Sequence, residues 1–395
     1  MFRSGLLCLA ATLLTHNLSG ATAAALELAP ADLAIILKAD GETRITFDPI
    51  LMPPAWQNRI AKAFQPTPVG DAFFAESPEA SWRLVAVRLA PCQPLIGYVT
   101  PLNDTLCFPQ LRLVWQPIDA TYVDPKFRYM ADDRAIHALY EILPDALLTP
   151  AESREWLRTK ALGTGMNDED RARFVHLQQR LLEGLRQSIL ALRMDRDESL
   201  YRDLGLRPEF AQAQSAEAFV GALQAFLHRF ATPDQLMELT AFSLPEGRMP
   251  PLLDEWAFVA FQPAERGKDL AQANLVIRSA RDGRPLFDYG KDMTVGARYE
   301  TESLIAALPG LPKADQDEIR ATVILNFPDR ARLEARIADP RQTHVAHTSC
   351  ASCHKLNKPA FDFHNLSYFR DHDITVSARV RGDVARELQW LRSIP

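Results

Sequence analysis

Two thiols and an imidazole close to the C-terminus are the side chains best suited to chemistry in this sequence. Cys350 and Cys353 are separated by two residues, and His354 follows directly. With this spacing on one helical turn, each thiol can add across one vinyl group of a haem while the imidazole reaches the iron. With five cysteines and nine histidines in 395 residues, chance would produce this pattern on the order of one time in a thousand. The motif therefore predicts one covalently bound haem.

Two other chemistries are open to the same thiols. His344 and His347 lie shortly before the motif, so imidazoles and thiolates together could also form a zinc site of the Cys/His type. Cys350 and Cys353 could also form a dithiol redox pair, although no βαβ pattern precedes them. Haem attachment takes place outside the cytoplasm, and a separate export signal in the same chain therefore favours it over both alternatives.

That export signal occupies the N-terminal residues. Arg3 precedes the apolar run Leu6–Leu14, and Ala21 and Ala23 follow with A-x-A spacing. We therefore expect residues 1–23 to be a signal peptide and the mature chain to be soluble, in the periplasm or secreted. No later stretch has the eighteen or so apolar residues that a membrane-spanning helix needs, so we expect no transmembrane segment in the mature chain.

The motif resembles the haem-attachment motif of c-type cytochromes. The resemblance covers residues 310–395 and implies one haem c, with Cys350 and Cys353 as the covalent attachment sites and His354 as the proximal axial ligand of the iron. It also implies the relay of single electrons to or from a redox partner protein. Residues 24–309 resemble no family of known function, and we expect them to form an exported α+β region.

In the commonest soluble cytochromes c, a methionine downstream of the motif is the distal iron ligand. This sequence differs from them at that position. No methionine follows Met293. We favour His364, which lies in an aromatic stretch able to wall a haem face, and His344 is the second candidate. Ligation by Met293 and a vacant position both stay open.

The distal position decides between functions, and the sequence leaves open whether the protein is an enzyme. A vacant or displaceable position would admit peroxide or oxygen. The first alternative to electron relay is therefore a haem enzyme of the peroxidase or oxidase type. The second is a haem sensor or an accessory protein for another redox enzyme.

Two further cysteines of the mature chain lie between two expected strands. Cys92 follows the alternating segment Trp82–Leu89, and Cys107 precedes Leu111–Trp115. In an exported protein this arrangement predicts a disulfide, which would close a loop of about 15 residues and stabilise the fold by roughly 3 kcal/mol. Two free buried thiols are the alternative.

The remaining patterns predict an α+β fold. We expect a disulfide-stapled β-rich N-terminal module, a helical middle, a second strand-containing region, and a helical, cytochrome-c-like C-terminal segment. Apolar residues at every third or fourth position predict helices. Alternating apolar and polar residues, or runs of β-branched and aromatic residues, predict strands. The helices are expected at Ala131–Leu143, with His137 solvated, at Arg171–Met194 with Asn167 as N-cap, around Phe219–Phe230, in two pieces across Ala314–Arg336, and at Asp383–Leu391; further strands are expected at Glu255–Phe261 and Asn274–Ile277.

Charge is unevenly distributed along the chain. The net charge is −6 without a long block of like charges, which excludes a nucleic-acid surface. Residues 340–395 nevertheless hold eight Lys and Arg against five Asp and Glu. These cations could form a basic collar that steers an acidic redox partner, or they could neutralise haem propionates and the acidic body of the same chain. The sequence leaves both open.

Overall fold

The structure is a computed structural model of the 395-residue chain. It describes residues 27–37, 45–65, 73–74, 80–94, 107–119, 130–131, 134–162, 165–243, 255–265, 267, 269–279, 283–291, 293–296, 304–322, 330–343, 348 and 376–393. The expected signal peptide, residues 1–23, lies outside these ranges.

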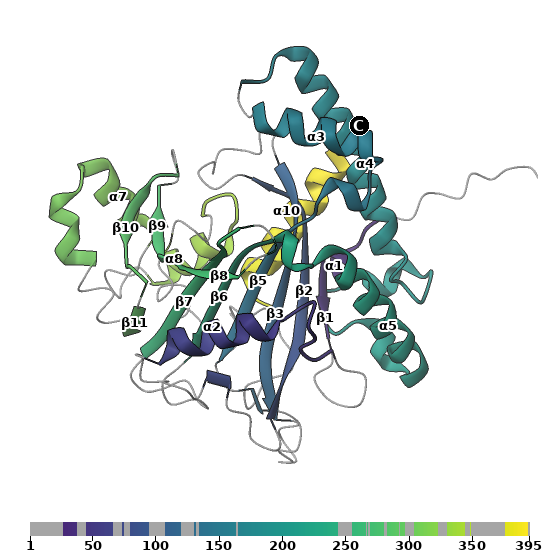
Figure 1. Cartoon of the computed structure of the whole chain (residues 1–395), viewed down its shortest axis with the longest axis horizontal. Coiled ribbons are helices and arrows are strands. Elements are labelled where there is room, and N and C mark those ends of the chain that lie inside the picture. The colour runs from purple at the N-terminus through teal and green to yellow at the C-terminus, as the bar shows by residue number, and fades with distance from the viewer. Residues whose placement is uncertain are drawn as a thin grey trace, which may run out of the picture.

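An antiparallel sheet of nine strands runs through the described part of the chain (Figure 1). Its main path follows the order β1-β2-β3-β5-β6-β7-β11, with β4 beside β3 and β8 beside β7, and a separate pair joins β9 to β10. The strands are β1 (Ala34–Ile36), β2 (Ala80–Pro94), β3 (Cys107–Asp119), β4 (Met130–Ala131), β5 (Ala135–Glu141), β6 (Leu236–Ser243), β7 (Glu255–Pro263), β8 (Leu270–Ala273), β9 (Val276–Arg278), β10 (Pro285–Asp288) and β11 (Met293–Gly296). The early and late strand regions of the sequence thus share one sheet.

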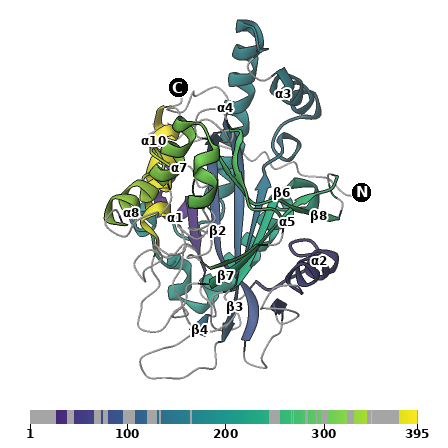
Figure 2. The same cartoon turned by 90° about the vertical axis from the view of Figure 1, so that its left-hand side faces the viewer.

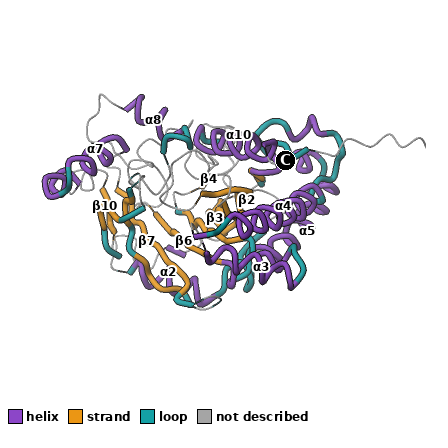
Figure 3. The backbone as a smooth tube through the Cα atoms, turned by 90° about the horizontal axis from the view of Figure 1, so that it is seen from above, coloured by secondary structure: helices purple, strands orange, loops and turns teal. Residues whose placement is uncertain are grey.

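Helices lie on both sides of this sheet. Helix α2 lies on one side, and α7, α8 and α10 lie on the other (Figures 2 and 3). The described α-helices are α1 (Pro30–Leu33), α2 (Pro54–Phe64), α3 (Pro150–Leu162), α4 (Asp168–Leu190), α5 (Ala213–Phe230), α7 (Lys313–Thr322), α8 (Arg330–Ala338) and α10 (Ala378–Ser393). None of the helices in the described part of the chain is long and apolar enough to cross a membrane. The mixed composition confirms the α+β class.

The two faces of the sheet differ in polarity because successive side chains of a strand point to opposite sides. On the α2 side, Leu113, Tyr140 and Leu239 are buried in the main apolar core together with residues of α2 and α5. The opposite side, which we call the α10 face, carries a row of polar side chains. These include Arg88 on β2 and, in register with it, Arg112 on β3, followed by the apolar Leu139 on β5 and by Glu238 on β6.

The predicted helix Ala131–Leu143 is wrong, because this segment contains the central strand β5, paired with β3 on one side and β6 on the other. The apolar residues of this segment fit both the helical period and the alternating period of a strand. Pairing with two neighbouring strands makes the segment a strand. His137 is consequently only partly exposed, and its ring meets Phe242 edge-on at a centroid distance of 5.4 Å.

Most other predicted elements are confirmed. Helix α4 begins at Asp168, and the side chain of its N-cap Asn167 accepts a hydrogen bond from the backbone N–H of Asp170 at 2.8 Å. Strands β2, β3 and β7 and helix α5 cover the segments expected for them. Helices α7 and α8 are the two expected pieces of the Ala314–Arg336 region.

Candidate functional site

The residues predicted to hold the cofactor lie outside the described part of the chain. They are Cys350, Cys353, His354, His344 and His364. The chain that carries them leaves the described structure after Thr343 and returns at Val376, apart from the buried residue Thr348. We call residues 344–375 the motif segment, and the site is built from the described residues that hold its two ends.

One arginine joins both ends of the motif segment. Arg379, in the first turn of α10, donates from Nη1 to the carbonyl oxygen of Ile337 at 3.0 Å and also to the carbonyl oxygen of Thr343. Arg379 is buried, with 6% of its surface exposed. Since Ile337 and Thr343 precede the motif segment and Arg379 follows it, this single side chain closes the segment at its base.

Close packing of α8 against α10 fixes the same region. A Cβ atom placed on Gly382 would lie 2.7 Å from the carbonyl oxygen of Ala338 and 2.9 Å from Cδ of Pro340. Contacts this short are far inside van der Waals distance, and one of the two atoms belongs to the backbone. Glycine at position 382 therefore permits the chain that enters the motif segment to lie against the helix that follows it.

Asp383 is the centre of a buried ionic cluster between α10 and the sheet. It accepts a hydrogen bond from Arg88 Nη1 at 2.8 Å and from Arg379 Nε at 3.2 Å, and Arg386 Nη2 lies 3.8 Å away. Burial opposes ionisation of Asp383, but the three guanidinium groups hold its pKa well below the usual range. The carboxylate therefore stays ionised and ties α10 to β2.

Glu387, one turn further along α10, extends the cluster to the strand that carries Cys92. Its Oε2 accepts a hydrogen bond from the backbone N–H of Cys92 at 3.1 Å, and its Oε1 accepts one from Arg386 at 2.9 Å. Burial raises the pKa of Glu387, and Arg386 opposes that shift. The two features that the sequence singled out, the motif segment and the Cys92 hairpin, are thus joined through α10.

Arg112 lies beside this cluster and is partly exposed; Asp383 and Glu238 favour its charge through space. It stands directly opposite Arg88 in the β2–β3 register, an arrangement of like charges that destabilises a sheet. Burial and the neighbouring Arg88 guanidinium lower the pKa of Arg112. Among the described residues, no carboxylate hydrogen-bonds to it. We call Arg88, Arg112, Arg379, Arg386, Asp383 and Glu387 the Asp383 cluster; it holds four guanidinium groups and two carboxyl groups.

Hydrogen-bond donors are also in excess in this region. Arg88 Nε, Arg386 Nε and Thr343 Oγ1 are buried and have no partner among the described residues. Buried donors normally find an acceptor, so three that lack one in a single region are informative. A group that brings negatively charged oxygens fits this surplus, and the two propionates of a haem are such oxygens. The described surroundings therefore fit the predicted cofactor.

Four arginines of the described C-terminal region show how far its cations are available for a basic collar. Arg379 and Arg386 are directed into the Asp383 cluster rather than to the surface. Arg341 donates to the side chain of Gln389, and Arg381 donates to the carbonyl oxygen of Val376 at 3.2 Å. Arg379 and Arg386 thus serve internal neutralisation, whereas the exposed Arg341 and Arg381 bond only to neutral acceptors and stay compatible with a basic collar.

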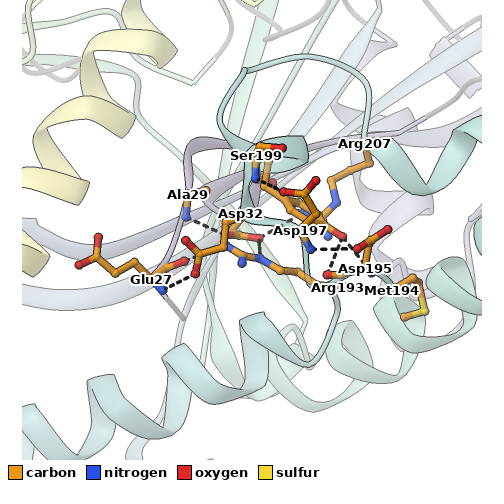
Figure 4. Close-up of polar contacts among 12 residues, drawn as sticks. Glu27, Ala29, Asp32, Arg193, Met194, Asp195, Asp197, Ser199 and Arg207 are labelled. Carbon is orange, nitrogen blue, oxygen red and sulfur yellow. Dashed lines mark hydrogen bonds and ion pairs between the residues drawn. The ribbon is translucent and has the colours of Figure 1, made fainter. Parts of the chain in front are cut away.

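A second buried ionic cluster lies beside α1, at the C-terminal end of α4 (Figure 4). Arg207 donates to Glu209 at 2.9 and 3.0 Å and to Asp32 at 3.3 Å, and Arg193 also donates to Asp32. The four charged side chains are at most 2% exposed. The hydroxyl of Tyr201 donates to Glu209 at 2.9 Å, and burial next to that carboxylate raises the pKa of Tyr201 to about 12.

This Asp32 cluster, consisting of Asp32, Arg193, Arg207, Glu209 and Tyr201, is balanced in charge. Two guanidinium groups face two carboxylates, and both guanidinium groups lie over the Tyr201 ring, at 4.6 and 4.7 Å from its centroid. This network holds α1 against the end of α4, and Arg193 Nη1 is its one buried guanidinium nitrogen without a hydrogen-bond partner among the described residues. The network leaves no charge for a ligand to neutralise.

Within the described ranges, no group of three or more His, Cys, Asp or Glu side chains is placed to hold a metal ion. No protein-family model, no curated protein and no solved structure matches this chain. The function is therefore inferred from the motif and from the described residues at its base.

Sequence reasoning missed the role of Arg88, Arg112 and Asp383. A signal was present, because Arg88 and Arg112 interrupt strands that are otherwise mostly apolar. Nothing in the sequence indicated that the two arginines lie opposite each other, or that a carboxylate almost 300 positions later would lie between α10 and β2.

Proposed function

We propose that this protein is an exported, periplasmic monohaem c-type cytochrome that relays single electrons to or from a redox partner protein. We expect this partner to be acidic if the cations outside the described ranges face it. The Cys350-x-x-Cys353-His354 motif carries the proposal. In it, Cys350 and Cys353 bind the haem covalently and His354 is the proximal axial ligand. When bound, the haem supplies a one-electron redox centre.

The residues around the motif segment have a defined part in this function. Arg379 and Gly382 hold the two ends of the segment together, and Asp383 fixes α10 to β2. A redox centre that transfers electrons benefits from fixed surroundings, because the charges around it then stay in place in both oxidation states. Two observations support the proposal: the two ends of the motif segment are held in place, and arginines outnumber carboxylates beside them.

The Cys92–Cys107 disulfide belongs to the same proposal, since it requires an oxidising compartment. Cys92 is buried and is not a free thiol. In the β2–β3 register, Cys107 lies opposite Pro94, two residues from Cys92. The side chain of Cys107 is outside the described part of the structure. Through Glu387 the hairpin would stiffen the strand against which α10 is held.

Covalent haem is the decisive test. Denaturing electrophoresis of the exported protein should show haem staining that is lost in the Cys350→Ser/Cys353→Ser variant. The matched control, Cys92→Ser/Cys107→Ser, removes the other two cysteines of the expected mature chain and should keep the stain. A colourless protein that contains zinc would overturn the proposal.

The distal ligand separates electron relay from enzymatic use of the haem. With His364 as sixth ligand, the iron is six-coordinate and low-spin, and His364→Ala should convert it to high-spin. An unchanged spectrum would direct attention to His344. Rapid binding of carbon monoxide by the reduced wild-type protein, together with turnover of peroxide, would replace the relay with a haem enzyme of the peroxidase or oxidase type.

A further inference from the structure

We propose that the exposed side of α10 is the docking surface for an acidic partner protein. This surface, which we call the α10 stripe, consists of Arg381, Ala385, Gln389 and Arg392 on the helix and of Arg341 beside it. The inference deepens the proposed function, because it says where the redox partner binds. It rests on that function only for the redox character of the partner, since the stripe itself lies wholly within the described part of the chain.

The α10 stripe is one continuous side of the helix. Arg381, Ala385, Gln389 and Arg392 are exposed and follow one another at intervals of three or four residues, which places their side chains in one row. The row is about 16 Å long, because Arg392 comes 11 positions after Arg381. Arg341 lies beside the row, since its guanidinium group donates to the side chain of Gln389. The helix lies on the side of the sheet opposite to α2 (Figure 3).

The charges of α10 are sorted between its two sides. Both acids of the helix are buried: 7% of the surface of Asp383 is exposed, and 1% of the surface of Glu387. Guanidinium groups of the Asp383 cluster surround these two carboxyl groups and cancel their field at the outer side of the helix. The α10 stripe itself carries no acidic side chain. The outer side is therefore positive, although the helix contains residues of both signs.

Two arginines of the stripe bind neutral acceptors only. Arg341 donates to a side-chain amide oxygen, and Arg381 donates to a backbone carbonyl oxygen. Asp339 lies two residues before Arg341 and is partly exposed. Its carboxylate accepts hydrogen bonds from the side chain of Gln342 and from the backbone N–H of Arg341, not from a guanidinium group. The charges of Arg341 and Arg381 therefore remain available to a partner.

The remaining acid at the edge of the stripe is Glu27. It lies 3.9 Å from Arg392, and both side chains are at least 66% exposed, so this pair is weak. Together with the Asp383 cluster beneath it, the stripe brings seven arginines against four carboxylates, Asp339 and Glu27 included, or against five when Glu238 is counted for Arg112. This region is thus net positive in a chain whose net charge is −6.

An acidic protein fits this surface better than a membrane does. A helix that lies on a bilayer inserts an apolar side beneath its basic residues. The apolar residues Val380, Val384 and Leu388 of α10 are instead buried in the main core. Arginine is enriched in protein interfaces, and opposite charges on two proteins raise the rate at which they associate.

The experiment measures the association of the full-length protein with a fluorescently labelled polyglutamate peptide, which represents an acidic protein surface. The association rate should fall as the ionic strength rises. Arg341→Gln/Arg381→Gln/Arg392→Gln should lower the rate by about tenfold or more at low ionic strength. The corresponding replacement of the three arginines by lysine keeps the charges and should keep most of the rate. The thermal midpoint should stay the same, because all three side chains are exposed.

A control of equal charge change comes from the α3–α4 pair. Arg158, Arg173 and Arg180 are about half exposed, and each forms an ion pair with a carboxylate of α3 or α4. Replacing these three arginines by glutamine should change the rate by less than about twofold. Equal losses in the two glutamine variants would show that net charge alone acts, and they would overturn the proposal, as would a wild-type protein that does not bind the peptide.

Two further measurements separate the remaining outcomes. Binding of the wild-type protein to phosphatidylglycerol vesicles but not to the peptide, lost in the stripe variant, would replace the protein partner with a membrane surface. In the haem-free Cys350→Ser/Cys353→Ser variant the peptide should associate at the wild-type rate, because the stripe lies outside the motif. Absence of covalent haem in the wild-type protein would overturn the proposed function and leave the binding of the peptide unchanged.

Discussion

The two buried ionic clusters of this protein contain the same kinds of side chain but differ in completeness. In the Asp32 cluster, two arginines pair with two carboxylates within 3.3 Å, and an aromatic ring lies against both guanidinium groups, although the buried Nη1 of Arg193 has no hydrogen-bond partner among the described residues. In the Asp383 cluster, four arginines share two carboxyl groups, and two of these arginines have buried Nε atoms without a partner. The two clusters therefore differ in their balance of positive and negative side chains, and not in whether every buried nitrogen has a partner.

The largest expected effect tests whether the Asp32 cluster is purely structural. Arg207→Leu leaves the buried carboxylate of Glu209 with only the Tyr201 hydroxyl and the Met194 backbone N–H as donors among the described residues, so we expect the free energy of unfolding to fall by about 3–5 kcal/mol. Urea denaturation measures this loss. The control Arg59→Gln breaks an ion pair with Asp269 whose side chains are about half exposed, and it should change stability by less than about 1 kcal/mol. A similarly small loss for Arg207→Leu would remove the contrast between the clusters.

An intermediate effect is expected at the centre of the Asp383 cluster. Asp383→Asn removes the carboxylate that pairs with Arg88 and Arg379. We therefore expect the free energy of unfolding at neutral pH to fall by about 2 kcal/mol. Because the arginines lower the pKa of Asp383 in the folded state, the folded protein binds fewer protons than the unfolded chain in acid. The contribution of Asp383 is thus complete above its unfolded pKa and is lost as the pH falls towards the folded one.

Denaturation at a series of pH values checks this second expectation. The difference in stability between wild type and Asp383→Asn should be constant near neutrality and should shrink below about pH 4. A difference that is independent of pH would mean that Asp383 acts through packing rather than through its charge.

The smallest effect concerns the close approach of α8 and α10. Gly382→Ala forces a methyl group against the Ala338 carbonyl oxygen and should cost about 1–2 kcal/mol. The matched control is Gly221→Ala, in the middle of α5, where a Cβ atom meets nothing within 4 Å. That control should stabilise the protein by up to about 1 kcal/mol, because alanine favours the helix. Equal effects of the two variants would show that α8 and α10 can move apart freely.

Local patterns predicted much of the secondary structure and failed at one central position. The cap at Asn167 and the apolar stripes of α4 and α5 depend on neighbouring residues, so the sequence shows them directly. The segment Ala135–Glu141 satisfies both the helical and the alternating pattern. It becomes β5 because β3 and β6 supply hydrogen bonds on its two sides, and these strands come from distant parts of the chain.

By itself, the sequence contains the motif of Cys350, Cys353 and His354, predicts an export signal and predicts the α+β composition, because each depends on residue types at short spacing. Only the tertiary structure decided that Arg88 and Arg112 stand opposite each other and that Asp383 ties α10 to β2. It also decided that Arg379 closes the motif segment. Strand register and helix docking bring these groups together across hundreds of residues, and the resulting charge imbalance is a property of their positions in space.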